Sequence, residues 1–189
     1  MIFVMTLWLQ KVLDFSPLTT GLIFGVPGLA AVVAGVIAGR SIGRFGVRNV
    51  LFAGMLVQGL GIVPLAFLGA NRIDLAVLIP ALFIGFFGHV TAIVAYTVTA
   101  TSGLPNDEQG LATGLTLMTQ NVAITIGIPI LSSIAATQAK ELSGIHLALG
   151  LNAPFILLSA IVIWFGLRPR DTTAAQAKVD EEEATAVLA

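Results

Sequence analysis

Long apolar runs dominate the chain, and its polar and charged residues fall mostly in short gaps between them. An α-helix rises about 1.5 Å per residue, so about 20 apolar residues are needed to cross a hydrocarbon core about 30 Å thick. Five runs reach that length, and they cover about residues 18–39, 49–70, 74–101, 108–137 and 145–167. Because these runs are continuous rather than alternating, they predict membrane-spanning helices and not the strands of a barrel.

The first residues form a shorter apolar segment. MIFVMTLWL, residues 1–9, makes about half a span before Gln10 and Lys11. A helix that ended in the middle of a bilayer would leave backbone groups without hydrogen-bond partners. We therefore expect a sixth helix whose front is truncated, in preference to a segment that lies at the interface. Trp8, close to Gln10 and Lys11, is typical of the interfacial end of a spanning helix.

Composition leads to the same fold class, an all-α membrane protein. The chain is 57% hydrophobic and only 10% charged, with a mean hydropathy of +0.98, whereas a soluble domain is about 25% charged. Without cysteine, disulfides and thiol nucleophiles are excluded, and the net charge of −1 does not favour nucleic acid as a partner. We expect no metal and no cofactor. Residues 169–189 are small, polar and acidic, which predicts a disordered tail.

The positive charges predict an orientation in the cell membrane. Six of the nine Lys and Arg residues would lie on one side, and they are Arg40, Arg44, Arg48, Arg168, Arg170 and Lys178. The other three would lie opposite, and they are Lys11, Arg72 and Lys140. Because cytoplasmic segments carry the excess of positive charge, we expect the arginine-rich gap and the C-terminus to be cytoplasmic.

Glycines in the arginine-rich gap form a motif. The stretch Gly39-x-x-x-Gly43-Arg44-x-Gly46-x-Arg48 lies between the second and third apolar segments. It resembles the loop motif of the major facilitator superfamily, G-x-x-x-D-R-x-G-x-R, which occupies that position in each six-helix half. Gly43 replaces the acidic residue that would pair with arginine and steady one end of the transport cycle. Arg44 and Arg48 then remain as anchors of the loop, and simple charge anchoring at the membrane surface is an equally open interpretation.

Two further stretches narrow the resemblance. LWLQKVLDFSPLTTGLIFGVPG is similar to the entry of the C-terminal half of fourteen-helix drug/proton antiporters, with Asp14 where glycine is usual. GLATGLTLMTQNVAITIGIPIL, from Gly110, resembles their penultimate helix. Together the three stretches imply the C-terminal six-helix half of a major facilitator fold. The implied function is proton-coupled efflux of small lipophilic compounds, and the implied partners are the bilayer and the missing N-terminal half.

Polar residues concentrate in the fourth and fifth segments, which the resemblance makes the helices that line the substrate cavity. At about 100° per residue, Gly85, His89 and Tyr96 share one face of the fourth. Candidates for the cavity are His89, Tyr96, Thr113, Thr116, Gln120 and Asn121. Thr113, Thr116, Gln120 and Gly127 share one face of the fifth segment. Hydrogen bonding between helices is the alternative role for Gln120 and Asn121.

His89 is the one ionisable side chain deep within a full span. Its charge can change near neutral pH, so a proton relay is one interpretation of its role. The favoured interpretation is a neutral histidine that hydrogen-bonds to a neighbouring helix, since no nearby carboxylate in the chain is placed to pair with it.

Glycines four residues apart allow helices to approach closely. Pairs of this kind are Gly21 and Gly25, Gly35 and Gly39, and Gly110 and Gly114.

Two other functional classes compete with a transporter. An intramembrane enzyme would need a nucleophile with a base, or a metal cluster, and the spans offer neither. A non-transporting membrane subunit or scaffold is the remaining alternative.

Overall fold

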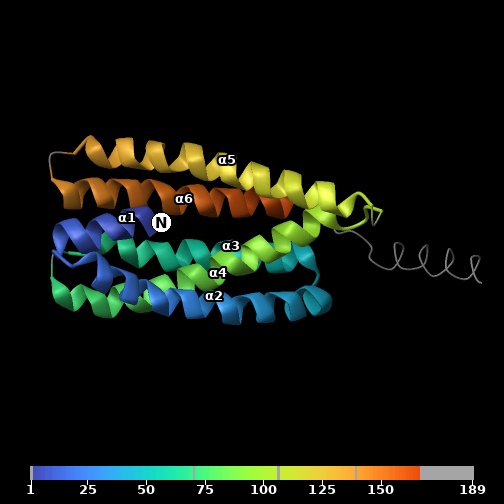
Figure 1. Ribbon diagram of the computed structural model, residues 1–189, viewed down its shortest axis with the longest axis horizontal. Helices are drawn as coiled ribbons and strands as arrows, with labels where there is room; N and C mark the ends of the chain where they lie inside the picture. Colours follow the sequence, from blue (N-terminus) through green and yellow to red (C-terminus); the bar gives the residue numbers. More distant parts are fainter. Residues whose placement is uncertain (1, 70, 106, 139, 167–189) are drawn as a thin grey trace, which may run out of the picture.

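The computed structural model describes residues 2–69, 71–105, 107–138 and 140–166, and these residues form an elongated bundle of helices that run along its long axis (Figure 1). The elements in chain order are α1 Ile2–Leu7, the π-helical turn η1 Trp8–Val12, α2 Pro17–Phe45, α3 Val47–Ile62, the 3-10 turns η2 Val63–Phe67 and η3 Arg72–Asp74, α4 Leu75–Thr101, α5 Gln109–Ala136 and α6 Glu141–Gly166. Five helical stretches in the described part are long and apolar enough to span a membrane. The predicted all-α membrane fold is confirmed.

The turn before α2 explains why Asp14, Ser16 and Pro17 occur at their positions in the sequence. Ser16 is the N-cap, and its side-chain oxygen accepts a hydrogen bond from the backbone N–H of Thr19 at 3.2 Å. Pro17 occupies the first turn, where its missing N–H leaves no helical bond unmade. Asp14, at the position where glycine is usual in the resembling family, has a positive φ of 56°. That left-handed backbone is the conformation that glycine adopts without steric cost.

The arginine-rich stretch is helical on both sides of one residue. We expected α2 to end near residue 39, but it continues to Phe45, and α3 begins at Val47. Arg44 therefore lies on the last turn of α2, whereas Arg48 lies on the first turn of α3. Only Gly46 breaks the helices, with φ 80°, a conformation that L side chains rarely adopt. The loop expected between the spans at 18–39 and 49–70 is therefore wrong. Apolar residues mark where the chain crosses the membrane, but a helix can continue beyond them into the polar region.

Glycines bring α3 and α4 together, although they are not the glycines that the spacing singled out. A Cβ on Gly54 would lie 2.8 Å from the backbone nitrogen of Ala92, and one on Gly61 would lie 2.6 Å from that of Gly85. By contrast, a Cβ on Gly21, Gly25, Gly35, Gly39, Gly110 or Gly114 would meet no described neighbour within 4 Å. The three pairs that the spacing singled out thus make no close helix contact within the described part of the chain, because spacing along one helix does not determine which face meets a neighbour.

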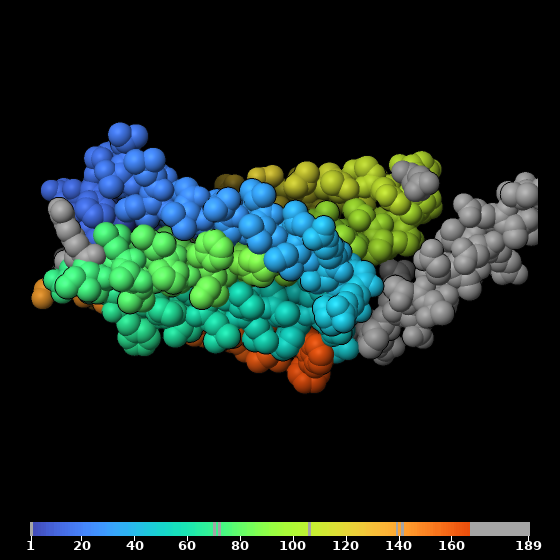
Figure 2. All heavy atoms as spheres, turned by 90° about the horizontal axis from the view of Figure 1, so that it is seen from below, coloured from blue at the N-terminus to red at the C-terminus, as the bar shows by residue number. Residues whose placement is uncertain are grey.

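Two clusters of buried apolar side chains hold the bundle. The larger lies at the end where the chain starts, and α1, η1, α3, η2, α4 and α6 contribute to it; Trp8 and Met5 are fully buried there. The smaller lies toward the arginine end, between α3 and α4, and it includes Val50 and Ala95. In Figure 1, α5 and α2 lie along opposite edges of the bundle. Figure 2 shows α2 (blue to cyan) on the surface beside α4 (green).

The tail expected to be disordered, residues 169–189, lies outside the described residues, as do Arg168, Arg170 and Lys178.

Candidate functional site

Arg48 fastens the start of α3 to the end of α6. Its Nε donates a hydrogen bond to the backbone oxygen of Trp164 at 3.1 Å, and Nη2 donates to the same oxygen. The guanidinium carbon also lies 4.2 Å from the centre of the Trp164 ring, which packs against Phe52 with ring centres 4.6 Å apart. The last carbonyls of a helix have no partner within it, so Arg48 caps α6 as well as stacking on it.

Arg44 and Gly39, the other motif residues on α2, are more exposed. The Arg44 guanidinium carbon lies 5.4 Å from the centre of the Phe45 ring, and no ion pair with a described residue accompanies it. Gly39 is exposed and meets no described side chain. Gly46 has a positive φ, and this backbone conformation explains why glycine occurs at that position of the motif. The four motif residues thus divide into one helix-capping arginine, one surface arginine, one turn glycine and one exposed glycine.

Along α5, the less exposed residues recur with the period of a helix, and most of the candidate residues are among them. Thr116 is buried, Thr113 and Gln120 are half-buried, and so is Gly127, whereas most residues between them are exposed. These four positions therefore form the face of α5 that turns toward the rest of the bundle. Asn121 is exposed, and its amide donates to the backbone oxygen of Leu117 within α5 at 2.9 Å. Thr113 and Thr116 also bond within their own helix.

His89 and Tyr96 on α4 point into different surroundings. His89 is exposed, and its ring meets Phe86 edge to face with centres 6.5 Å apart. Among the described residues His89 makes no hydrogen bond to another helix, so the favoured interpretation of its role finds no support in the packing. Tyr96 is half-buried and packs against the small cluster that contains Val50 and Ala95. Neither residue shares a hydrogen bond or a ring contact with a described residue of α5.

Two side chains at the opposite end of the bundle, those of Trp8 and His146, make contacts that the sequence did not reveal. The indole Nε1 of Trp8 donates to the backbone oxygen of Gly69 at 3.0 Å, and Nε2 of His146 lies 2.6 Å from that of Leu68. Both bonds tie distant segments to the connection after η2. Trp8 lies inside the packed core and not in an aromatic belt facing lipid, because the short first helix is surrounded by its neighbours. A tryptophan followed by polar residues occurs both in packed cores and in aromatic belts, so the sequence pattern does not distinguish the two positions.

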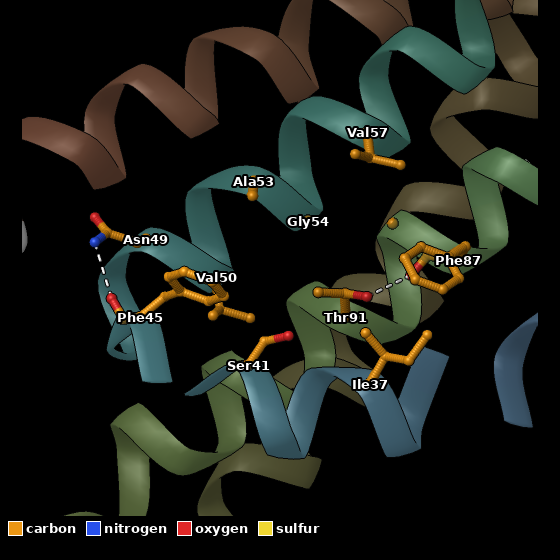
Figure 3. Close-up of a pocket in the computed structure, with 11 residues that line it drawn as sticks. Ile37, Ser41, Phe45, Asn49, Val50, Ala53, Gly54, Val57, Phe87 and Thr91 are labelled. Carbon is orange, nitrogen blue, oxygen red and sulfur yellow. Dashed lines mark hydrogen bonds between the residues drawn. The ribbon is translucent and has the colours of Figure 1, made fainter. Parts of the chain in front are cut away.

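A cavity of about 380 Å³ opens between α2, α3 and α4 near the arginine end (Figure 3). None of the six candidate cavity residues lines it. Its walls are apolar for most of their length, and Ser41 and Asn49 are its polar members toward the end of α2. The described residues contain no group of three His, Cys, Asp or Glu side chains that could hold a metal ion.

Known proteins resemble the chain along most of its length. The family model described as Major Facilitator Superfamily matches residues 1–189. Multidrug resistance protein Stp of Mycobacterium tuberculosis is 28% identical over 136 residues, which are 72% of this chain and 25% of that protein. Puromycin resistance protein pur8 of Streptomyces alboniger is 26% identical over 189 residues, which cover 90% of this chain and 38% of that protein. No solved structure matches significantly.

The chain thus spans between a quarter and two-fifths of the length of these curated relatives. Their names describe resistance to drugs, and the family is one of membrane transporters and not of enzymes. Helices long enough to span a bilayer, the arginine–glycine motif around Gly46 and the family match agree. This multi-pass membrane chain belongs to the major facilitator superfamily.

Proposed function

We propose that the chain forms the C-terminal half of a proton-coupled multidrug efflux transporter. The observation that carries the proposal is the similarity to two drug-resistance proteins over 72% and 90% of this chain. The bundle supplies one wall of a pathway, and an N-terminal half would supply the other. The substrate would be a small lipophilic compound, and the proton would be the coupling ion.

The polar residues of α4 and α5 are our candidates for contact with the substrate. Thr113, Thr116 and Gln120 support this role because polar side chains on a spanning helix are costly in lipid, and these three share one face of α5. His89 is the candidate proton carrier, since an exposed imidazole on a spanning helix can meet water within a cavity. Tyr96 and Asn121 are secondary candidates, because each has an alternative role in packing or in bonding to its own helix.

Transport in everted membrane vesicles tests the function. Vesicles that contain this chain together with the N-terminal half should take up puromycin when a proton gradient is imposed, and a protonophore should abolish the uptake. Vesicles with either half alone serve as controls. If the assembled pair inserts and moves no drug with any gradient, the proposal fails and a non-transporting subunit is favoured.

Gln120→Leu tests the proposed cavity. Loss of its amide should change the relative rates for different drugs by about tenfold, the effect of about 1.4 kcal/mol of lost binding, while the amount of inserted protein stays the same. Gln58→Leu on α3 is the matched control, because it makes the same change in the apolar part of α3, residues 50–62, where Gln58 is the one long polar side chain. An identical drug profile for Gln120→Leu and the unchanged protein would assign Gln120 to helix packing.

A further inference from the structure

The cavity between α2, α3 and α4 has one polar end and one apolar end. Ile37, Val57 and Phe87 line the part that lies deeper in the spans, whereas Ser41 and Asn49 lie toward the turn at Gly46. Its volume of about 380 Å³ is within the range of about 300–1,000 Å³ that is usual for ligand sites. The glycine contact between α3 and α4 forms part of the floor, since Gly54 and Gly88 both line it.

Positive charge lies at the polar end. Phe45 lines the cavity, and the guanidinium carbon of the neighbouring Arg44 lies 5.4 Å from the centre of its ring. Arg40 precedes Ser41 on α2 and is exposed. No carboxylate lines the cavity, and among the described residues neither arginine has an acidic partner. Gly43 contributes to this imbalance, because an acidic residue there would place a negative charge next to Arg44.

Ser41 supplies a hydrogen-bond donor at the same place. Figure 3 shows its hydroxyl extending from α2 into the space between the helices. Within the described part of the chain the hydroxyl has no hydrogen-bond partner, unlike Thr91, which donates to the backbone oxygen of Phe87 at 2.8 Å, and Asn49, which donates to that of Phe45 at 2.9 Å. A partner for Ser41 would have to come from an occupant of the cavity or from water.

We propose that this cavity binds one anionic phospholipid, with an acyl chain between α2 and α3 and the phosphate at Ser41 and Arg44. An acyl chain fits the apolar walls, and the depth is appropriate because the arginines mark the end of a spanning helix. An arginine recognises a phosphate through charge-assisted, bidentate hydrogen bonds. An anionic headgroup is favoured over a zwitterionic one, since no carboxylate is present for an ammonium or choline group. The site is independent of the proposed drug pathway.

Native mass spectrometry of the purified full chain in mild detergent tests the site. Phosphatidylglycerol and phosphatidylcholine with identical acyl chains are offered separately at equal concentration. We expect phosphatidylglycerol to bind about tenfold more tightly, and Arg44→Gln to remove most of that preference. Lys140→Gln removes the same charge at the opposite end of the bundle and should leave the preference unchanged.

A second variant tests the acyl-chain part separately. Ala53 is an exposed residue of the cavity wall, so Ala53→Phe should fill the space without disturbing the core and should weaken binding of both lipids. Ala123→Phe, on the exposed surface of α5, adds the same bulk elsewhere and should have no effect. Equal binding of the two lipids, or a preference that survives Arg44→Gln, would overturn the proposal. Unchanged binding in a folded Ala53→Phe protein would overturn it as well.

Discussion

Asp14 holds a left-handed backbone, with φ of 56°, in the turn between η1 and α2. Asp tolerates this conformation better than most residues, and glycine adopts it without the steric cost of a Cβ. We predict that Asp14→Gly unfolds at an equal or higher denaturant concentration, and that Asp14→Ala is less stable than Asp14→Gly by about 1 kcal/mol. Both variants remove the carboxylate, so their difference isolates the backbone. Equal free energies of unfolding for the pair in detergent titrations would contradict this view.

Arg48 distinguishes two interpretations of the arginine motif. If it only marks the cytoplasmic surface, lysine should replace it without loss. The double hydrogen bond to the Trp164 oxygen and the stacking on its ring need the planar guanidinium instead. We therefore predict that Arg48→Lys lowers the free energy of unfolding by about 1–2 kcal/mol.

Arg40→Lys is the control for Arg48→Lys, because Arg40 is exposed and is not involved in such a clamp. Stability is measured on the purified chain by denaturant titration. If both variants retain full stability, charge anchoring alone accounts for the motif.

The helices themselves were predictable, whereas their contacts were not. Hydropathy located the spans because lipid requires a continuous apolar run. It could not show that α2 continues through Arg40 and Arg44, because a helix outside the hydrocarbon core is under no such requirement. Nor could spacing reveal that Gly54 and Gly88 meet while Gly35 faces open space. Which glycines touch depends on the rotation of each helix, and that is set by the neighbours it packs against.

The α3–α4 contact gives a prediction at the scale of the elements. A Cβ on Gly88 would lie 2.6 Å from the backbone oxygen of Gly54 and would also crowd the backbone nitrogen of Gln58. Backbone atoms cannot rotate away, so the helices must separate. We predict that Gly88→Ala lowers the free energy of unfolding by about 1–3 kcal/mol, the usual cost of overpacking.

Gly35→Ala is the matched control for Gly88→Ala. It also adds one methyl group to a helix, at a position where no described atom lies within 4 Å. The higher helix propensity of alanine should leave the stability unchanged or raise it by up to about 1 kcal/mol. Equal effects of the two substitutions would show that α3 and α4 do not depend on glycine for their contact.

At the scale of the whole molecule, the candidate site was the least predictable part. The face with Thr116 and Gln120 emerged from periodicity, because a helix that packs on one side repeats that side every three or four residues. Arg48 and Trp164 are 116 residues apart in the chain, and no local pattern links them. His146 and Leu68, 78 residues apart, likewise meet only through the fold. Contacts of this kind depend on the order of the helices in the bundle.

The orientation of the molecule is a prediction of its charge distribution. Six of nine basic residues fall on the side of the arginine motif in the predicted topology. A reporter fused after Arg170 should therefore be active in its cytoplasmic form only, and one inserted at Lys140 in its exported form only. The reverse pattern of activity would invert the topology and would place the proposed phospholipid in the outer leaflet.

The fastening of α6 at both of its ends has a mechanical consequence. Arg48 joins its last turns to the start of α3, and His146 joins its first turns to the segment that follows α3. Two helices joined at both ends cannot slide along each other unless one of these bonds breaks, so α3 and α6 form a rigid frame. Thr116 is the one buried residue that the structure describes in α5, so this helix is held by fewer buried side chains than α3 or α4. Any rocking of helices within this bundle is therefore expected to shift α5 first, and with it the polar face that contains Gln120.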